Sequence, residues 1–260
     1  MAVRRRARLE VFFCLFLITV ITVPAFANPG KESGEPVRNG TLMKGLEKLL
    51  IVGPGGPYEA MKEAGEIFSN LKGVLVEVIK GPPETWFNQE ADLIYGGAPN
   101  MIEDFMAGHP GVIDPGSICQ LSKRQIGIVV RRGNPRKIRS LDDLGREGLK
   151  VLNVELETMG KFQQLVPNIT DHIYKSVRTG DQGILTWRSV PELDAWITYK
   201  SWHVVLNQES EFIPLSFNDA WRSTPIAVTT WTKQRGMADE FIAFLKSQKG
   251  AEIFRRRGWE

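Results

Sequence analysis

The sequence predicts an α/β fold whose ligand site lies at the carboxyl ends of its strands. Two successive units of strand, glycine loop and helix carry this prediction, over residues 48–69 and 91–107. The chain has 260 residues, 42% of them hydrophobic, which is enough to bury one large core or two smaller ones. In open α/β sheets, ligands bind beyond the carboxyl ends of the strands.

The start of the chain is typical of a secretory signal peptide. Four arginines lie between positions 4 and 8, an apolar stretch covers residues 11–20, and Ala25-Phe26-Ala27 forms a small-x-small cleavage pattern. The apolar stretch is shorter than the roughly 20 residues of a bilayer span, which favours cleavage near Ala27 over an uncleaved anchor. We therefore expect residues 1–27 to be removed, residues 28–40 to form a flexible leader, and the mature protein to work in the periplasm.

Charge and cysteine content narrow the function classes. The formal net charge of +3 belongs to the export segment, which holds four arginines and one glutamate. The remaining chain is near neutral, which argues against nucleic acid as a partner, because nucleic-acid-binding proteins carry a basic face. Cys14 leaves with the signal, so Cys119 is the one cysteine of the mature chain and an intrachain disulfide is impossible.

Apolar periodicity and Gly/Pro breaks divide the mature chain into elements. The first strand ends in Gly53-Pro54-Gly55-Gly56-Pro57, and the next helix is expected from Tyr58, since proline suits a first helical position. A second glycine loop, Gly96-Gly97-Ala98, precedes another helix. The expected strands cover 48–52, 74–79, 91–95, 125–131, 149–154, 194–198, 203–206 and 225–230. The expected helices cover 58–69, 100–107, 159–166, 170–178, 237–245 and 251–257, with shorter helical stretches at 86–87 and 140–143.

Several motifs along this order point to one family. They are Gly53 to Pro57, Gly81-Pro82 with Thr85-Trp86, Ala91 to Ala98, Arg132 to Pro135, Leu141 to Leu144, Asp194 to Thr198, and Phe241 to Trp259. In these motifs the chain resembles the type II periplasmic solute-binding proteins, especially the molybdate- and sulfate-binding group and, within it, the accessory colonization factor C type. The resemblance covers nearly all of the mature chain.

That resemblance implies a two-lobed fold, in which each lobe is a mixed sheet flanked by helices and two crossing strands form the hinge. Residues 41–122 and 214–260 would form the first lobe, and residues 123–213 the second. A ligand would lie in the cleft, and the lobes would close on it by a hinge motion.

Main-chain amides at helix starts are the predicted anion-binding groups. Such amides lack intrahelical partners and carry a partial positive charge, and glycine lets a ligand approach the main chain closely. The predicted contacts are Gly55, Gly56 and Tyr58 at the first helix start, Gly97 and Ala98 at the second, and Thr158 and Met159 at a third in the other lobe. An ordinary chain reversal is the alternative for each glycine turn.

Three side chains complete the predicted site, each with an alternative. The resemblance implies that the Tyr199 hydroxyl contacts an oxyanion, although a core-packing or a surface aromatic role would equally account for this residue. It also implies that Trp86 walls the cleft, unless this residue is a buried anchor. Arg124 begins the first crossing strand and could bind an anion in a bidentate manner, or could be a solvated hinge residue.

One departure from the resembled family concerns the loop after the strand at 149–154. That loop is rich in glycine and serine in the family, whereas this chain has Glu155 and Glu157. If either carboxylate faces the cleft, a fully ionised sulfate or molybdate is a poor ligand, and a protonated oxyanion or an amine-bearing organic acid fits better. We expect both to face solvent, with Glu157 favouring the helix N-terminus that it precedes.

Catalytic and metal-binding patterns are missing from the sequence. His109, His172 and His203 lie far apart, and Ser117 and Cys119 lack a recognisable partner motif. We therefore expect a binding protein without a cofactor. The leading interpretation is capture of a small anion for the permease of an ABC-type transporter. A sensory or colonization-related protein that acts through a chemoreceptor is the alternative, and a secreted enzyme on the same fold is less favoured.

Overall fold

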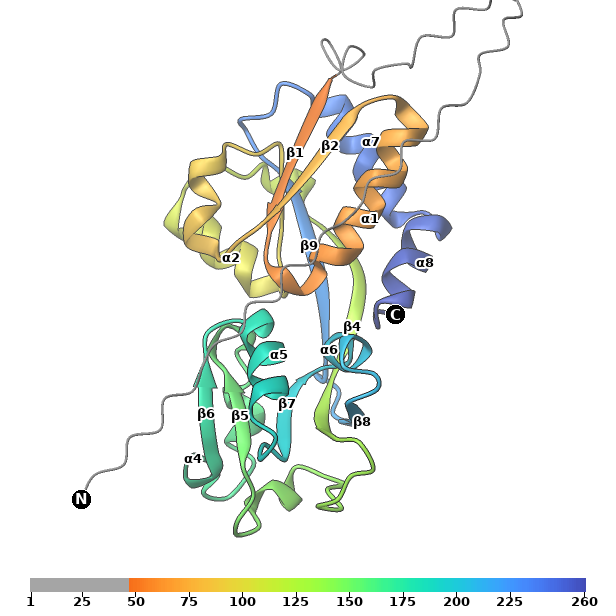
Figure 1. Ribbon diagram of the computed structural model, residues 1–260. Helices are drawn as coiled ribbons and strands as arrows, with labels where there is room; N and C mark the ends of the chain where they lie inside the picture. Colours follow the sequence, from red (N-terminus) through yellow and green to blue (C-terminus); the bar gives the residue numbers. More distant parts are fainter. Residues whose placement is uncertain (1–46) are drawn as a thin grey trace, which may run out of the picture. The chain divides into compact units, whose positions relative to one another are not determined.

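The computed structural model describes residues 47–260; the predicted signal peptide and leader lie outside this range. The strands of the described chain follow the order β2-β1-β3-β9-β4-β7-β5-β6, and β8 pairs with β4. They divide into two lobes, each with a mixed parallel and antiparallel sheet (Figure 1). The first lobe contains the strands β1 (Lys48–Gly53), β2 (Leu75–Lys80) and β3 (Leu93–Tyr95), and the helices α1 (Gly55–Lys72), α2 (Pro99–Gly108), α7 (Arg235–Lys246) and α8 (Gln248–Arg256).

The second lobe is built from the middle of the chain. Its strands are β5 (Val151–Val154), β6 (Ile173–Val177), β7 (Ala195–Tyr199) and β8 (Ser210–Pro214), and its helices are α3 (Gly160–Gln163), α4 (Ile169–His172), α5 (Gly180–Ser189) and α6 (Lys200–Val205). Strand β5 lies parallel to both β6 and β7, whereas β7 pairs antiparallel with β4. The predicted two-lobed α/β class is confirmed.

Two long strands, β4 (Cys119–Arg131) and β9 (Trp221–Val228), connect the lobes (Figure 1). The first half of β4 pairs antiparallel with β9, and its second half, from Ile126, pairs with β7 and β8. Strand β9 then pairs with β3 in the first lobe. These are the crossing strands that the family resemblance implies, and β4 starts six residues earlier than the strand predicted at 125–131.

Each lobe has hydrophobic clusters of its own. In the first lobe, one cluster packs Phe68 and Phe241 from α1 and α7 against the sheet, and another packs Phe105 of α2 against the opposite face. The second-lobe cluster extends to Leu215 and Ala220. The boundary at residue 213 stays a prediction, and the second-lobe core includes residues just beyond it.

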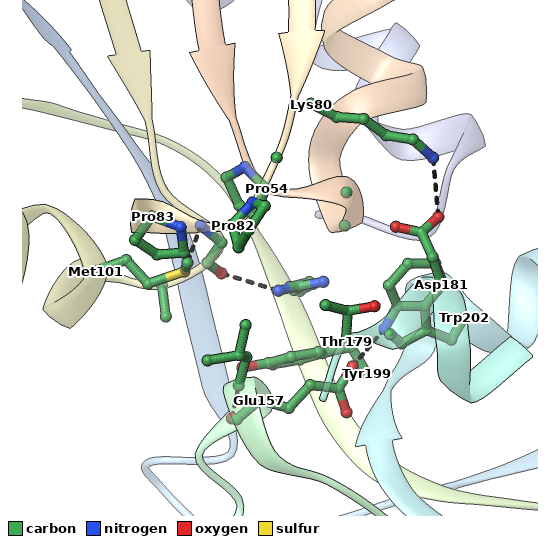
Figure 2. Close-up of a pocket in the computed structure, with 18 residues that line it drawn as sticks. Pro54, Lys80, Pro82, Pro83, Met101, Glu157, Thr179, Asp181, Tyr199 and Trp202 are labelled. Atoms are coloured by element: carbon green, nitrogen blue, oxygen red, sulfur yellow. Dashed lines mark hydrogen bonds and ion pairs between the residues drawn. The ribbon is translucent and has the colours of Figure 1, made fainter. Parts of the chain in front are cut away.

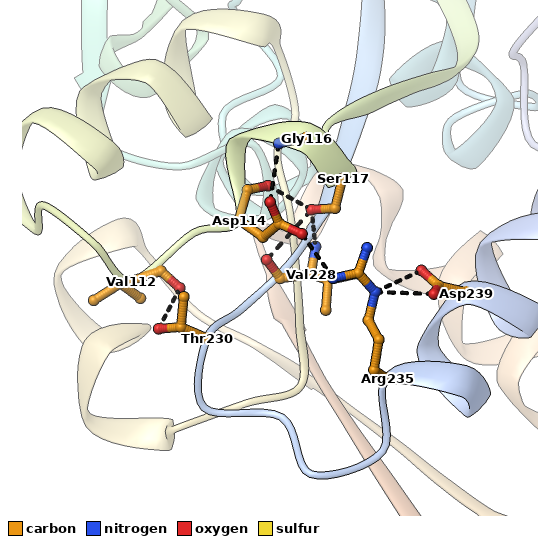
Figure 3. Close-up of polar contacts among 8 residues, drawn as sticks. All are labelled: Val112, Asp114, Gly116, Ser117, Val228, Thr230, Arg235 and Asp239. Atoms are coloured by element: carbon orange, nitrogen blue, oxygen red, sulfur yellow. Dashed lines mark hydrogen bonds and ion pairs between the residues drawn. The ribbon is translucent and has the colours of Figure 1, made fainter.

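Polar contacts fix the first-lobe ends of both crossing strands (Figure 3). Arg235, at the start of α7, forms ion pairs with Asp114 ahead of β4 and with Asp239 one helical turn later. The Ser117 hydroxyl accepts a hydrogen bond of 2.8 Å from the backbone N–H of Val228 in β9. The segment before β4 and the end of β9 are therefore tied to each other and to α7.

Helix α1 begins and ends where its local sequence allows. Pro54 is extended and precedes the first helical residue, and Gly73 ends the helix in the left-handed region at φ 67°. The predicted start at Tyr58 is three residues too late, because Gly55 and Gly56 belong to the first turn. Proline is tolerated throughout that turn, where the backbone N–H groups have no intrahelical acceptor.

Two predicted elements in the second lobe are wrong. The helix predicted over 170–178 is mostly the strand β6, whose side chains are half-buried or exposed, so that apolar alternation is weak at this edge of the sheet. The strand predicted over 203–206 belongs to α6, which Trp202 anchors in the core despite two neighbouring valines. Helix α5 and strand β8 were not predicted.

Within residues 47–260, no helix combines the length and the apolar character that crossing a membrane requires.

Candidate functional site

A cavity of about 240 Å³ lies between the two lobes, at the carboxyl ends of β1 and β3 (Figure 2). Its lining residues from the first lobe are Pro54, Gly55, Gly56, Lys80, Gly81, Pro82, Pro83, Gly97, Ala98 and Met101. Those from the second lobe are Leu156, Glu157, Thr179, Gly180, Asp181, Tyr199 and Trp202, and Arg124 comes from the crossing strand β4.

Parallel strands bring the two glycine loops to the same place. Strands β1 and β3 are parallel neighbours, so the helix starts that follow them, at Gly55 and at Pro99, meet at one sheet edge. The Tyr95 hydroxyl donates a hydrogen bond of 3.1 Å to the Pro54 carbonyl and holds the first loop in place. The first turns of two helices thus lie beside the cavity, with the partial positive charge of their N-termini.

Arg124 lines the cavity and is only 4% exposed. Its Nη2 donates to the Gly97 carbonyl at 2.9 Å, and its Nη1 donates to the Ser201 hydroxyl at 3.3 Å. The guanidinium lies 3.5 Å from the centre of the Tyr199 ring. Its Nε finds no hydrogen-bond partner in the structure. Burial lowers the pKa of Arg124, so the cation is desolvated without a full set of partners.

The glycines at the two helix starts make room for this guanidinium. A Cβ atom at Gly56 would lie 2.8 Å from Arg124 Nη1, and one at Gly97 would lie 3.1 Å from Nη2. Side chains at these positions would displace the cation. The loops therefore need glycine for close packing of protein against protein, a reason that sequence reasoning did not include.

Glu157 is the acidic group of the cavity, and it is 7% exposed. One carboxylate oxygen accepts a 2.6 Å hydrogen bond from the Thr198 hydroxyl, and the other accepts from the indole N–H of Trp202. Burial raises the pKa of Glu157 to about 7. The expectation that this carboxylate faces solvent is wrong, because donors from β7 and α6 hold it inside; Glu155 on the same turn is exposed.

Six of the ten predicted contact residues line this cavity: Gly55, Gly56, Gly97, Ala98, Arg124 and Tyr199. Tyr199 is both a core residue and a lining residue, since its ring is 1% exposed and its hydroxyl donates to the Glu157 carbonyl at 3.3 Å.

The other four predicted contacts lie elsewhere. Tyr58 lines an adjoining cavity beside α1. Trp86 is buried, and its indole N–H donates to the Gly81 carbonyl at 2.9 Å, as expected of an anchor. Thr158 is exposed at the end of a short 3₁₀ turn, with φ 53°, and Met159 packs in the second-lobe core. The helix that follows them, α3, is a single turn.

A different helix start faces the cavity from the second lobe. Thr179, Gly180 and Asp181 begin α5, and Thr179 forms a capping box with Gln182. A capping box has the pattern Thr-x-x-Gln, which is present in the sequence and would have predicted this helix start. Gly180 is required because a Cβ atom there would lie 2.2 Å from the Trp202 ring, an impossible approach.

Ion pairs join the two lobes at the mouth of the cavity. Lys80 of β2 pairs with Asp181 at 3.1 Å, and Glu84 pairs with Arg178. The Asp181 carboxylate also lies directly against Gly55, so a group of the protein already occupies the positive end of α1.

Across residues 47–260, no group of three or more His, Cys, Asp or Glu side chains is arranged to hold a metal ion. What the cavity offers is a buried cation, a buried carboxyl group and two helix starts, which suits non-covalent binding of a small charged molecule.

Similar structures share this two-lobed architecture. Peb3 from Campylobacter jejuni is 24% identical, with a TM-score of 0.67, and the match covers 82% of this chain and 99% of Peb3. A PEB3 structure with bound L-phospholactate matches with the same identity and coverage and a TM-score of 0.69. The sulfate-binding protein SubI from Mycobacterium tuberculosis is 18% identical over 82% of this chain and 86% of SubI, with a TM-score of 0.66.

The periplasmic molybdate-binding protein of Azotobacter vinelandii is 14% identical over 82% of this chain and 98% of its own, with a TM-score of 0.63. No curated protein matches the chain in sequence. The family model of bacterial extracellular solute-binding proteins matches residues 49–260, which is most of the chain and includes both lobes and the cavity between them. The chain therefore belongs to the bacterial extracellular solute-binding proteins.

Proposed function

We propose that this protein is exported to the periplasm, captures a small anion between its two lobes, and delivers it to the membrane permease of an ABC-type transporter. The observation that carries the proposal is the Arg124 side chain, a buried guanidinium whose Nε has no partner and which lines the cavity between the lobes.

Arg124 is a cation that the fold holds away from water. Removing a guanidinium from water costs several kcal/mol unless a counter-charge and hydrogen bonds compensate it. Arg124 has only two hydrogen bonds and a stacked aromatic ring, and its Nε has no hydrogen-bond partner, so the charge is incompletely compensated. A small anion that binds here offsets this cost.

Neighbouring groups support the same placement of the anion. Gly97 and Ala98 precede the ten-residue helix α2, whose first-turn amides add partial positive charge. The face of the Tyr199 ring packs against the Arg124 guanidinium. We propose that these residues, with Gly56, form the anion subsite, and that capture is a closure of the lobes without covalent chemistry.

The relatives in fold favour a small anion as the ligand. Structures with this architecture include proteins described as binding L-phospholactate, sulfate and molybdate. Many members of the solute-binding family hand their ligand to an ABC permease, and we extend this role to the present chain. Export depends on the proposed signal peptide over residues 1–27; N-terminal sequencing of the secreted protein should begin near Asn28.

Titration of the mature protein tests the proposal. Sulfate, phosphate, molybdate and small organic acids are added to the purified protein, and melting temperature and binding heat are recorded. A ligand at 100 times its Kd should raise the free energy of unfolding by about 2.7 kcal/mol. If none of these anions changes the melting temperature, the anion-binding function is refuted.

A second experiment separates transport from signalling. Cells lacking this protein should lose uptake of the identified ligand and keep their chemotactic response to other attractants. Normal uptake with a lost response to the ligand would instead assign the protein to a chemoreceptor.

A further inference from the structure

The cavity contains two groups of opposite charge that the protein does not pair with each other. The Arg124 guanidinium lines the cavity and its Nε has no hydrogen-bond partner, while the Glu157 carboxylate accepts hydrogen bonds from Thr198 and Trp202. Both side chains are more than nine-tenths buried and both line the cavity. A ligand in this space therefore meets a cation and a carboxyl group at once.

The hydrogen bonds of Glu157 favour its role as an acceptor. The Trp202 indole N–H can only donate, so the carboxylate oxygen that it contacts must accept. Burial raises the pKa of Glu157 to about 7, and a donor or cation from the ligand would favour the ionised form. A bare oxyanion of high charge would instead lie near a second negative charge and have no donor to offer it.

The apolar part of the cavity lining suits a carbon skeleton. Pro82, Pro83, Met101 and Leu156 line the cavity together with Arg124 and Glu157, and its volume is about 240 Å³. One water in the liquid occupies about 30 Å³, so a molecule of several non-hydrogen atoms has room here. A lone tetrahedral ion would leave these apolar walls without contact.

We infer that the ligand is a small organic acid that also carries a hydrogen-bond donor, an ammonium or a hydroxyl group, with its anionic group at Arg124 and its donor at Glu157. This inference rests on the proposed anion-binding function and narrows it. It separates amino and hydroxy acids from sulfate, molybdate and simple carboxylic acids as ligands of this chain.

Matched ligands test the inference with the wild-type protein. Within each of three series one chain length is kept and only the donor changes: propionate, lactate and alanine; succinate, malate and aspartate; glutarate, 2-hydroxyglutarate and glutamate. Sulfate and molybdate serve as the bare oxyanions. Isothermal titration at pH 8 should give at least tenfold tighter binding for a donor-bearing acid than for its donor-free partner in the best series. The amino and hydroxy arms show which donor is used.

Variants assign the preference to one side chain. Glu157→Gln keeps the shape and removes the negative charge, so the preference of at least tenfold should fall below about threefold. Glu155→Gln is the matched control, because this neighbouring carboxylate is exposed, and it should keep the wild-type preference. A crystal structure of the wild-type protein with its tightest donor-bearing acid needs no variant; the ligand donor should lie within about 3.2 Å of Glu157.

The outcomes distinguish a wrong ligand class from a wrong anion-binding function. If a bare oxyanion or a donor-free acid binds as tightly as the amino and hydroxy acids, the inference is overturned and the anion-binding function stands. The same holds if Glu157→Gln keeps the preference, or if the ligand donor points away from Glu157 in the crystal. If no anion of the panel binds, the proposed function fails and the inference fails with it.

Discussion

Replacing Arg124 by methionine tests the central feature of the site, because a binding arginine and a structural arginine respond differently. The substitution keeps an unbranched side chain of similar reach and removes the charge and all five N–H donors. Arg124 is 4% exposed, with two hydrogen bonds and an unpartnered Nε. Loss of the Arg124 side chain should change the free energy of unfolding and the free energy of ligand binding by different amounts.

The stability terms largely cancel. The hydrogen bonds to the Gly97 carbonyl and the Ser201 hydroxyl are lost, at about 1.5–3 kcal/mol each. In return, a cation no longer has to be desolvated, and that cost is several kcal/mol per buried ion. We expect the free energy of unfolding to change by less than about 2 kcal/mol, and the melting temperature of the ligand-free protein to stay close to the wild-type value.

The binding terms do not cancel. If the ligand anion forms two charge-assisted hydrogen bonds in this region, their loss costs at least about 3 kcal/mol, which is more than a hundredfold in Kd. The assay is isothermal titration with whichever acid binds the wild-type protein, alongside urea unfolding of the ligand-free proteins.

Arg131→Met is the matched control on the same strand. Arg131 donates to the carbonyls of Leu193, Trp187 and Val190 and stacks on the Trp187 ring at 4.0 Å, away from the cavity. Its loss leaves partly buried carbonyls without a donor, so we expect destabilisation of about 2–4 kcal/mol with Kd unchanged. The reasoning is refuted if Arg124→Met binds within threefold of wild type, or if it destabilises the protein as strongly as Arg131→Met.

Three further predictions concern the same cavity. Burial raises the pKa of Glu157 from an ordinary 4.5 to about 7, so between these pH values the folded protein keeps a proton that the unfolded chain has lost. The free energy of unfolding should therefore fall by about 3 kcal/mol as pH rises from about 4.5 to 7, and then level off. Urea unfolding of Glu157→Gln should lack this pH-dependent step. Gly97→Val should displace the Arg124 guanidinium and weaken binding at least tenfold in calorimetry, and wild-type affinity would contradict the close packing. Asp181→Asn removes a partly exposed ion pair between the lobes that is worth at most about 1 kcal/mol. The rate of ligand release, measured by stopped flow, should therefore rise by no more than about fivefold. Glu77→Gln breaks a similar ion pair within the first lobe and should leave the release rate unchanged.

Much of the first lobe follows from local sequence. The apolar strands at 48–52 and 91–95, their glycine loops and the helices after them appear close to their predicted places, since both strands are mostly buried and each break is a glycine or proline. The prediction failed at β6 and α6, where an edge strand shows little alternation and a tryptophan anchor outweighs the strand preference of valine.

The arrangement of the site could be predicted from the sequence only in part. The sequence by itself determined that glycine loops precede helices and that Glu157 follows a buried strand. Only the tertiary structure decided that Glu157 points inward and that α5 rather than α3 faces the cavity. The physical reason is that the donors of Glu157, Thr198 and Trp202, lie more than 40 residues away along the chain. Periodicity reports which residues are neighbours within one element, and a buried charge is decided by partners brought from other elements.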